Sequence, residues 1–227
     1  MTRKVKDSDG RRTRWDDHRE ARRAELVEAA VRAIDLHGPD APVADIAAEA
    51  GVSKPVLYRF FADKAELHAA VGKWGAELVL ANLMPALLSD APPRERTKAA
   101  VDAYLSTIEL HPQVFLLLVR NPTGDPLAEG KASVAAAMAR SLNDGLRSLG
   151  VDSGGAEPWA RGLVGLGLSV GEWWLERRTM SRAAVSRYLT AFVWHAFAGI
   201  VEEYDVDLGA LSEPTTARVT PLRKEKP

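Results

Sequence analysis

The chain has 227 residues, of which 46% are hydrophobic and 27% are charged, and its formal net charge is −1. This length and composition are typical of a soluble globular protein of one domain or two small ones. The absence of Cys excludes disulfides, thiolate metal sites and a Cys nucleophile. No apolar run reaches the roughly 18 residues of a membrane span, and residues 1–23 lack the apolar core of a secretory signal. We therefore expect a cytoplasmic protein with no membrane partner.

The charge is unevenly distributed along the chain. Residues 1–23 contain nine basic and five acidic side chains, a local excess of four positive charges. Such a segment suits contact with a polyanion at one end of the protein. A solvated leader without such a role is the alternative. We expect residues 1–14 to form a disordered basic arm.

Helical periodicity dominates the remainder, and no alternating apolar run of strand length is present. In chain order, the predicted helices cover residues 15–37, 43–50, 53–61, 63–84, 93–111, 114–119, 125–149, 158–178 and 181–204. The prediction is an all-α fold of about nine helices. It divides into a DNA-binding domain at 15–68, a larger helical domain at 69–207 and a disordered tail at 208–227.

The two short helices between residues 43 and 61 have the features of a helix-turn-helix. Ala47 is small enough for the helices to touch, and Gly51 can adopt the positive φ of the turn. Val52 supplies an apolar plug after the turn, and Ser53 is placed to cap the second helix. Two packed helices with an accidental surface are the alternative interpretation.

The start of the second helix is the part of this motif that enters the major groove of DNA. The residues expected to contact DNA are Ser53, Lys54, Pro55, Val56, Tyr58, Arg59 and Lys64. Lys54 and Tyr58 can donate to phosphates, and Arg59 can do the same or bind a guanine edge. Lys64 begins the next helix, whose free N–H groups also suit a phosphate.

Residues 19–72 resemble the N-terminal domain of the TetR family of bacterial transcriptional regulators. The matching stretches are Leu26-Val27-Glu28-Ala29-Ala30, Asp45-Ile46-Ala47, Ala50-Gly51-Val52-Ser53, Leu57-Tyr58-Arg59-Phe60-Phe61 and Lys64-Ala65-Glu66-Leu67. The resemblance implies a homodimer on a near-palindromic operator. It also implies a C-terminal helical domain that binds a small ligand and thereby releases DNA.

Within this resemblance, Tyr58 and Lys64 match positions that usually touch phosphates. Two departures from the family pattern are present. Pro42 and Val43 replace the hydroxyl residue that usually opens the first helix of the motif, so one cap and phosphate contact is in doubt. Phe60 stands where a His is usual, so any polar role there is lost.

Four glycines, at positions 162, 165, 167 and 171, lie inside a predicted helix, where each costs about 1 kcal/mol relative to Ala. Close helix contact would explain them. Because the family dimerises through its last two helices, the resemblance implies an isologous interface. The interface residues expected are Gly167, Gly171, Val185 and Phe192. The alternative is that the glycines pack inside the protomer or make room for a ligand.

Aromatic and long apolar residues crowd the predicted C-terminal domain. Those expected to line a ligand site are Trp74, Leu78, Tyr104, Ile108, Phe115, Leu118, Met138, Leu142 and Trp173. Plain core is the alternative. Few charges point inward, which favours a hydrophobic effector. Residues 51–58 and 163–174 also resemble the subset that regulates fatty-acid and lipid metabolism in mycobacteria and relatives, which implies an acyl chain or acyl-CoA.

No catalytic or metal-binding set is found, because the five His are scattered and none forms an i, i+4 pair. No cofactor is expected. The prediction is a ligand-responsive, homodimeric DNA-binding regulator that binds double-stranded operator DNA and is expected to repress; activation stays open. An all-helical lipid carrier with a vestigial helix-turn-helix is the alternative. An enzyme for an apolar substrate would lack a nucleophile–base pair.

Overall fold

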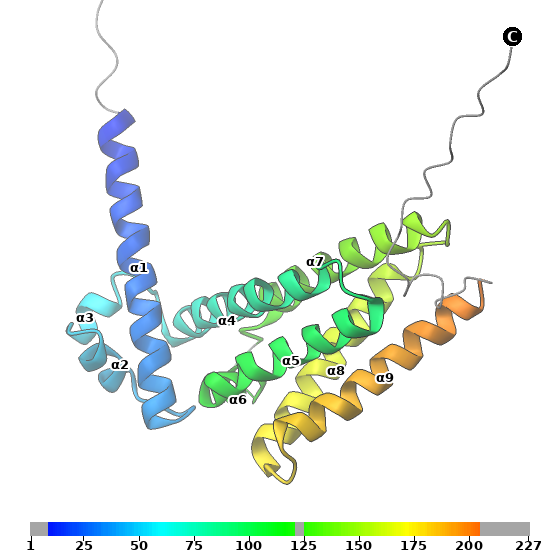
Figure 1. The fold of residues 1–227 in the computed structure, drawn as a ribbon. Helices are drawn as coiled ribbons and strands as arrows, with labels where there is room; N and C mark the ends of the chain where they lie inside the picture. Colours follow the sequence, from blue (N-terminus) through cyan, green and yellow to red (C-terminus); the bar gives the residue numbers. More distant parts are fainter. Residues whose placement is uncertain (1–8, 121–124, 205–227) are drawn as a thin grey trace, which may run out of the picture.

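The structure, a computed structural model, describes residues 9–120 and 125–204, with side chains from residue 17 onward. This part of the chain forms nine helices and no strand, as predicted (Figure 1). The helices are α1 (Asp9–His37), α2 (Val43–Glu49), α3 (Lys54–Leu57), α4 (Lys64–Leu87), α5 (Pro93–Leu110), α6 (Pro112–Arg120), α7 (Ala128–Ser148), α8 (Ala156–Arg177) and α9 (Arg182–Glu202).

Several helix ends form where the sequence places a cap or a glycine. The carboxylate of Asp63 accepts from Glu66 N at 2.8 Å at the start of α4. The hydroxyl of Ser181 accepts from Ala184 N at 3.3 Å at the start of α9. Gly38, with φ +90°, follows the last residue of α1. These local signals placed the ends of three helices correctly.

Other ends differ from the prediction. Helix α1 begins at Asp9, so residues 9–14 are helical instead of disordered; this segment is rich in Arg, which favours helix. Helix α4 continues through Pro85, which lies in its last turn, where few hydrogen bonds remain to be lost. Helix α7 begins at Ala128, three residues after the predicted start at 125, because Asp125 accepts from Leu127 N at 3.2 Å and forms a turn before the helix. Residues 1–8 and 205–227, which hold the rest of the expected arm and the whole expected tail, lie outside the described residues.

The N-terminal core is formed by α1 to α4 together with one face of α6. Its buried side chains include Leu26, Ile34, Ile46, Leu57, Phe61, Leu67 and Val71, and α6 adds Val114, Leu117 and Leu118. The core therefore extends past the predicted boundary at residue 68, along α4 and into α6. Helix α4 joins the two domains, as Figure 1 shows.

A second core lies between α5, α8 and α9. Its buried members are Val101, Leu105, Ile108, Trp174, Leu175, Val185, Leu189 and Val193. Over the described residues, α9 is the one helix that is long and apolar enough to cross a membrane by length and composition. Its most apolar window has a mean hydropathy of 1.2, and 28% of that window is buried. Much of this apolar helix is therefore left uncovered in the single chain.

Candidate functional site

The residues predicted to contact DNA lie in or next to α3 and at the first residue of α4, and we call them together the recognition surface. Ser53, Lys54, Pro55, Tyr58 and Arg59 are exposed, and Val56 and Lys64 are half-buried. The helical part of α3 is only Lys54–Leu57, followed by turns in which Arg59 N donates to Val56 O at 3.1 Å. Ser53 occupies the N-cap position with extended backbone, but its hydroxyl makes no cap hydrogen bond. Ser53 therefore occupies the predicted cap position, but its side chain does not form the predicted cap hydrogen bond.

The opposite side of α3 is firmly packed. Leu57 and Phe61 are each only 1% exposed. Gly51 makes the turn with φ +63°. Phe60 packs against the N-terminal core, so this departure from the family pattern supplies packing in place of a polar group. At the start of α2, Pro42 is the N-cap and makes no side-chain cap bond, as its chemistry requires.

Ion pairs tie the helix-turn-helix to its neighbours. Arg32 Nε lies 2.8 Å from Glu49 Oε1, which links α1 to α2. Arg23 lies 2.9 Å from Glu66 and places its guanidinium carbon 4.6 Å from the Phe61 ring centroid. The backbone N–H of residue 62 and then Arg23 lower the pKa of Glu66, which keeps it ionised. The contacts of Arg23 hold the start of α4, which carries Lys64, against α1.

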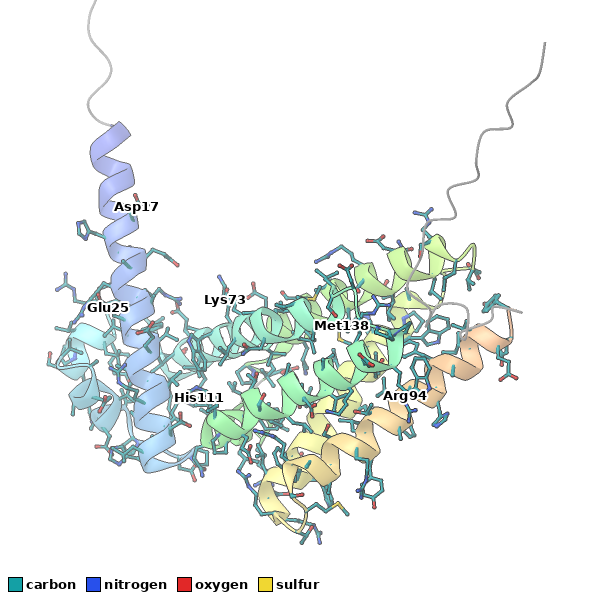
Figure 2. All side chains as sticks on the ribbon, viewed as in Figure 1. Asp17, Glu25, Lys73, Arg94, His111 and Met138 are labelled. Atoms are coloured by element: carbon teal, nitrogen blue, oxygen red, sulfur yellow. The ribbon has the colours of Figure 1, made fainter. Side chains whose placement is uncertain are left out.

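A cavity of about 230 Å³ lies in the C-terminal domain, between α4 and the helices that follow it. Eight of the nine predicted ligand residues line it: Trp74, Leu78, Tyr104, Ile108, Phe115, Leu118, Met138 and Leu142. Figure 2 labels Met138 among the side chains of α7. The structure thus brings together residues from four different helices that the sequence alone could only group by hydrophobicity.

The polar groups in the cavity wall are largely engaged by the protein itself. Tyr104 Oη donates to Gly167 O at 2.7 Å, and Thr107 Oγ1 donates to Ala103 O at 2.7 Å. Burial raises the pKa of Tyr104, so its phenol remains protonated. The wall therefore offers mainly apolar contact, which suits a hydrophobic ligand.

The ninth predicted residue, Trp173, does not line the cavity, and that prediction was wrong. It is 38% exposed, whereas its neighbour Trp174 is 1% exposed and belongs to the second core. Adjacent residues on a helix point about 100° apart, since 3.6 residues make one turn. Trp174 takes the inward direction, so Trp173 faces outward.

Three of the four predicted interface residues pack against side chains of their own protomer. A Cβ on Gly171 would lie 2.8 Å from Phe115 Cζ and from Tyr104 Oη, and one on Gly167 would lie 3.5 Å from Tyr104 Cζ. Val185 is 4% exposed. Their side of each helix is used within the protomer, as the alternative interpretation of the glycines held. The physical reason is that bulky side chains of α5 and α6 pack directly against the glycines of α8.

Phe192, the fourth predicted residue, is 64% exposed, and Tyr188 lies one turn before it with 58% exposure. On α8 and α9, the glycines at 162, 165 and 199 would accept a Cβ with no atom within 4 Å. We call Tyr188, Phe192 and these three glycines the open face. Sequence reasoning missed Tyr188, although its i, i+4 spacing from Phe192 was a usable signal.

Within the described residues, no group of three or more His, Cys, Asp or Glu side chains could hold a metal ion. The described His side chains are spread over α1, α4, α9 and the α5–α6 turn. The candidate site thus has three parts, namely the recognition surface, the apolar cavity and the open face.

Comparisons with known proteins cover both domains. The family described as "Bacterial regulatory proteins, tetR family" matches residues 26–71, and "Tetracyclin repressor-like, C-terminal domain" matches residues 82–208. An uncharacterized HTH-type transcriptional regulator of Mycobacterium tuberculosis is 35% identical over 199 residues, which are 86% of this chain and 85% of the relative. The HTH-type transcriptional activator FasR of Mycolicibacterium smegmatis is 30% identical over 78% of this chain and 83% of its own.

Solved structures share the fold. A tetR-family transcriptional regulator from Streptomyces coelicolor superimposes with a TM-score of 0.65 at 23% identity, covering 85% of this chain and 87% of the other. The transcriptional regulator FadR from Bacillus subtilis, solved in complex with stearoyl-CoA, superimposes with a TM-score of 0.60 at 18% identity. That match covers 74% of this chain and 95% of FadR.

Proposed function

This chain belongs to the TetR family of bacterial transcriptional regulators, and we propose that it is a homodimeric operator-binding repressor released by a long-chain acyl ligand. The observation that carries the proposal is the combination of an outward, firmly packed recognition surface with a separate apolar cavity in the same chain. The first can bind DNA and the second can bind an effector. Each step has its own support.

The recognition surface supports DNA binding. Lys54 and Arg59 are exposed, and Tyr58 is 45% exposed. These side chains can reach phosphates or base edges while Leu57 and Phe61 anchor the helix behind them. A rigid element whose start faces outward is the geometry that the major groove accepts.

The cavity supports an acyl effector. It is bordered along α4 from Trp74 to Leu87, a span of roughly 20 Å at about 1.5 Å per residue. An elongated apolar space of this kind fits a flexible chain better than a compact polar metabolite. The FadR structure, with the same fold, holds stearoyl-CoA, which is consistent with an acyl chain here.

The open face supports a homodimer. Exposed aromatic side chains on an apolar helix leave surface that water solvates poorly, and a second copy of the same face would cover it. The glycines at 162, 165 and 199 would allow close approach of another backbone. Two recognition surfaces held at a fixed separation can then bind half-sites about 34–36 Å apart.

Release follows when the ligand binds better to a dimer geometry with another separation of the recognition surfaces. We expect the free protein to repress and the ligand to relieve repression. A reporter fused to the regulated promoter tests the sign: deletion of the regulator raises expression if it represses. Lower expression after deletion would assign it instead to activation, the activity for which the relative FasR is named.

The test of DNA binding uses fluorescence anisotropy with DNA from upstream of the protein's own gene at about 150 mM salt. We expect binding at least about a thousandfold tighter than to a scrambled duplex. Palmitoyl-CoA should weaken it by about 5- to 150-fold, and CoA alone should not. Binding of palmitoyl-CoA without any sequence-dependent DNA binding would indicate a lipid carrier instead.

The test of the dimer is sedimentation of Phe192→Arg. An isologous interface would bury the new charge once in each subunit without a partner of opposite charge, so we expect monomers. Leu88→Arg is the matched control, because Leu88 is 66% exposed and lies at the end of α4, outside the open face. A Phe192→Arg protein that remains dimeric would refute the open face as the interface.

A further inference from the structure

One polar contact joins the cavity wall to the DNA-binding domain. His111 lies in the turn between α5 and α6 and lines the cavity. Its Nδ1 lies 2.6 Å from Oδ2 of Asp35, which is in the last turn of α1. Figure 2 shows His111 at the end of the C-terminal domain that faces α1. These two residues are 76 positions apart in the sequence.

The contact stabilises a carboxylate in an unfavourable place. Asp35 lies at the C-terminal end of α1, where the helix dipole is negative. Its Oδ1 is buried and finds no hydrogen-bond donor among the described residues. A carboxylate oxygen accepts, so the imidazole donates from Nδ1 to Oδ2. The hydrogen bond from His111 therefore offsets the unfavourable electrostatics of a carboxylate at the C-terminal end of α1.

The imidazole is also fixed from the cavity side. The rings of His111 and Trp74 meet edge to face, with centroids 5.1 Å apart and an interplanar angle of 84°. Trp74 lines the cavity and packs against the N-terminal core. A ligand larger than the empty space at this end of the cavity would displace one of the two rings, because close-packed interiors do not yield evenly.

We propose that the Asp35–His111 hydrogen bond transmits cavity occupancy to the DNA-binding domain. His111 acts as a positioning residue that holds the C-terminal end of α1 while the cavity is empty, and a ligand that moves the imidazole releases it. The proposal rests on the proposed function, because it assumes an effector in this cavity. It adds the contact through which that effector changes DNA affinity.

A second set of contacts also connects the cavity to the DNA-binding domain. The experiment distinguishes coupling through these contacts from coupling through the hydrogen bond. Val114 and Leu118 of α6 belong to the N-terminal core and also line the cavity. This shared apolar wall could carry the same signal. Coupling through the hydrogen bond is lost when the imidazole is replaced, whereas coupling through the apolar wall is retained.

The first measurement is the coupling factor, the ratio of the operator Kd with saturating palmitoyl-CoA to that without it. His111→Phe keeps a ring against Trp74 but cannot bond to Asp35, and we expect it to reduce the factor at least about fivefold. Asp35→Asn retains an acceptor oxygen and should preserve most of the coupling. Glu109→Gln is the matched control, since Glu109 bonds to Arg178 and Arg182 and not to α1; its factor should stay within about twofold of the unmodified protein.

The second measurement needs neither operator nor ligand. Amide hydrogen exchange in residues 30–37 should be faster in His111→Phe than in the unmodified dimer or in Glu109→Gln, because α1 loses its anchor. If palmitoyl-CoA does not change the operator Kd of the unmodified protein, the effector in the proposed function is wrong. Amide exchange alone then decides whether His111 positions α1. Unchanged exchange, or a His111→Phe protein that keeps the full coupling factor, would overturn the inference.

Discussion

Substituting Ala for Gly171 tests whether the inner side of α8 is packed as tightly as the structure indicates. The added Cβ would lie 2.8 Å from Phe115 Cζ, 2.8 Å from Tyr104 Oη and 2.9 Å from Ile108 Cδ1. Tyr104 cannot simply turn away, because its hydroxyl is bonded to a backbone oxygen of α8. The substitution therefore crowds three side chains that also line the cavity.

The expected magnitude follows from two opposing contributions. Replacing a helical Gly by Ala gains up to about 1 kcal/mol in helix propensity. Overpacking a close-packed interior costs about 1–3 kcal/mol. Gly171→Ala should therefore lower the free energy of unfolding by roughly 0–2 kcal/mol. Gly145→Ala, on α7 with no atom within 4 Å of the added Cβ, should show the gain alone.

The assay is thermal unfolding of both variants at one fixed protein concentration, because self-association would make the melting temperature depend on concentration. We expect Gly145→Ala to melt above Gly171→Ala by about 2–4 °C for each kcal/mol that separates them. Palmitoyl-CoA should also bind Gly171→Ala more weakly, because the crowded side chains reduce the cavity. If the two variants gain stability equally, the side chains move aside freely and the reasoning about α8 fails.

Three further predictions concern the DNA-binding domain. Lys64→Ala should weaken operator binding on all sequences and reduce the slope of log affinity against log salt by about 0.9; an unchanged slope in a salt titration would remove Lys64 from the phosphate contacts. Asp63→Ala should lower the free energy of unfolding by about 1 kcal/mol in urea denaturation, because it removes the cap of α4, and no loss would show that the cap is dispensable. Burial, with Lys64 nearby, lowers the pKa of His68, so the unfolded chain binds a proton more readily than the folded one. Stability should therefore fall as the pH drops below about 6.5, and His68→Leu should flatten that pH dependence in denaturation curves.

Several turns and helix starts were predictable because their signals are local. Gly51, Asp63 and Ser181 act on backbone groups within four residues, so their consequences can be read without knowing any distant contact. The apolar patterns of α4, α5, α6 and α7 likewise indicated which side chains would face inward, and eight of the nine predicted ligand residues line the cavity.

Helix α8 was harder to interpret, because it is apolar on more than one side. A pattern that is hydrophobic all round does not show which side meets the protomer and which remains open. The structure places Gly171 against α5 and α6 and leaves Trp173 outside. The Asp35–His111 contact is equally invisible in the sequence, because it joins residues that only the folding of α1 against the α5–α6 turn brings together.

The amino-acid sequence by itself determined an all-helical chain, its helix-turn-helix and the side chains that this motif leaves exposed, since caps, turns and periodicity act over a few residues. Tertiary structure alone decided which glycines are crowded, which aromatic residues stay uncovered and how the cavity meets α1. The physical reason is that each of these depends on the bulk and position of side chains from distant helices, which no local pattern encodes.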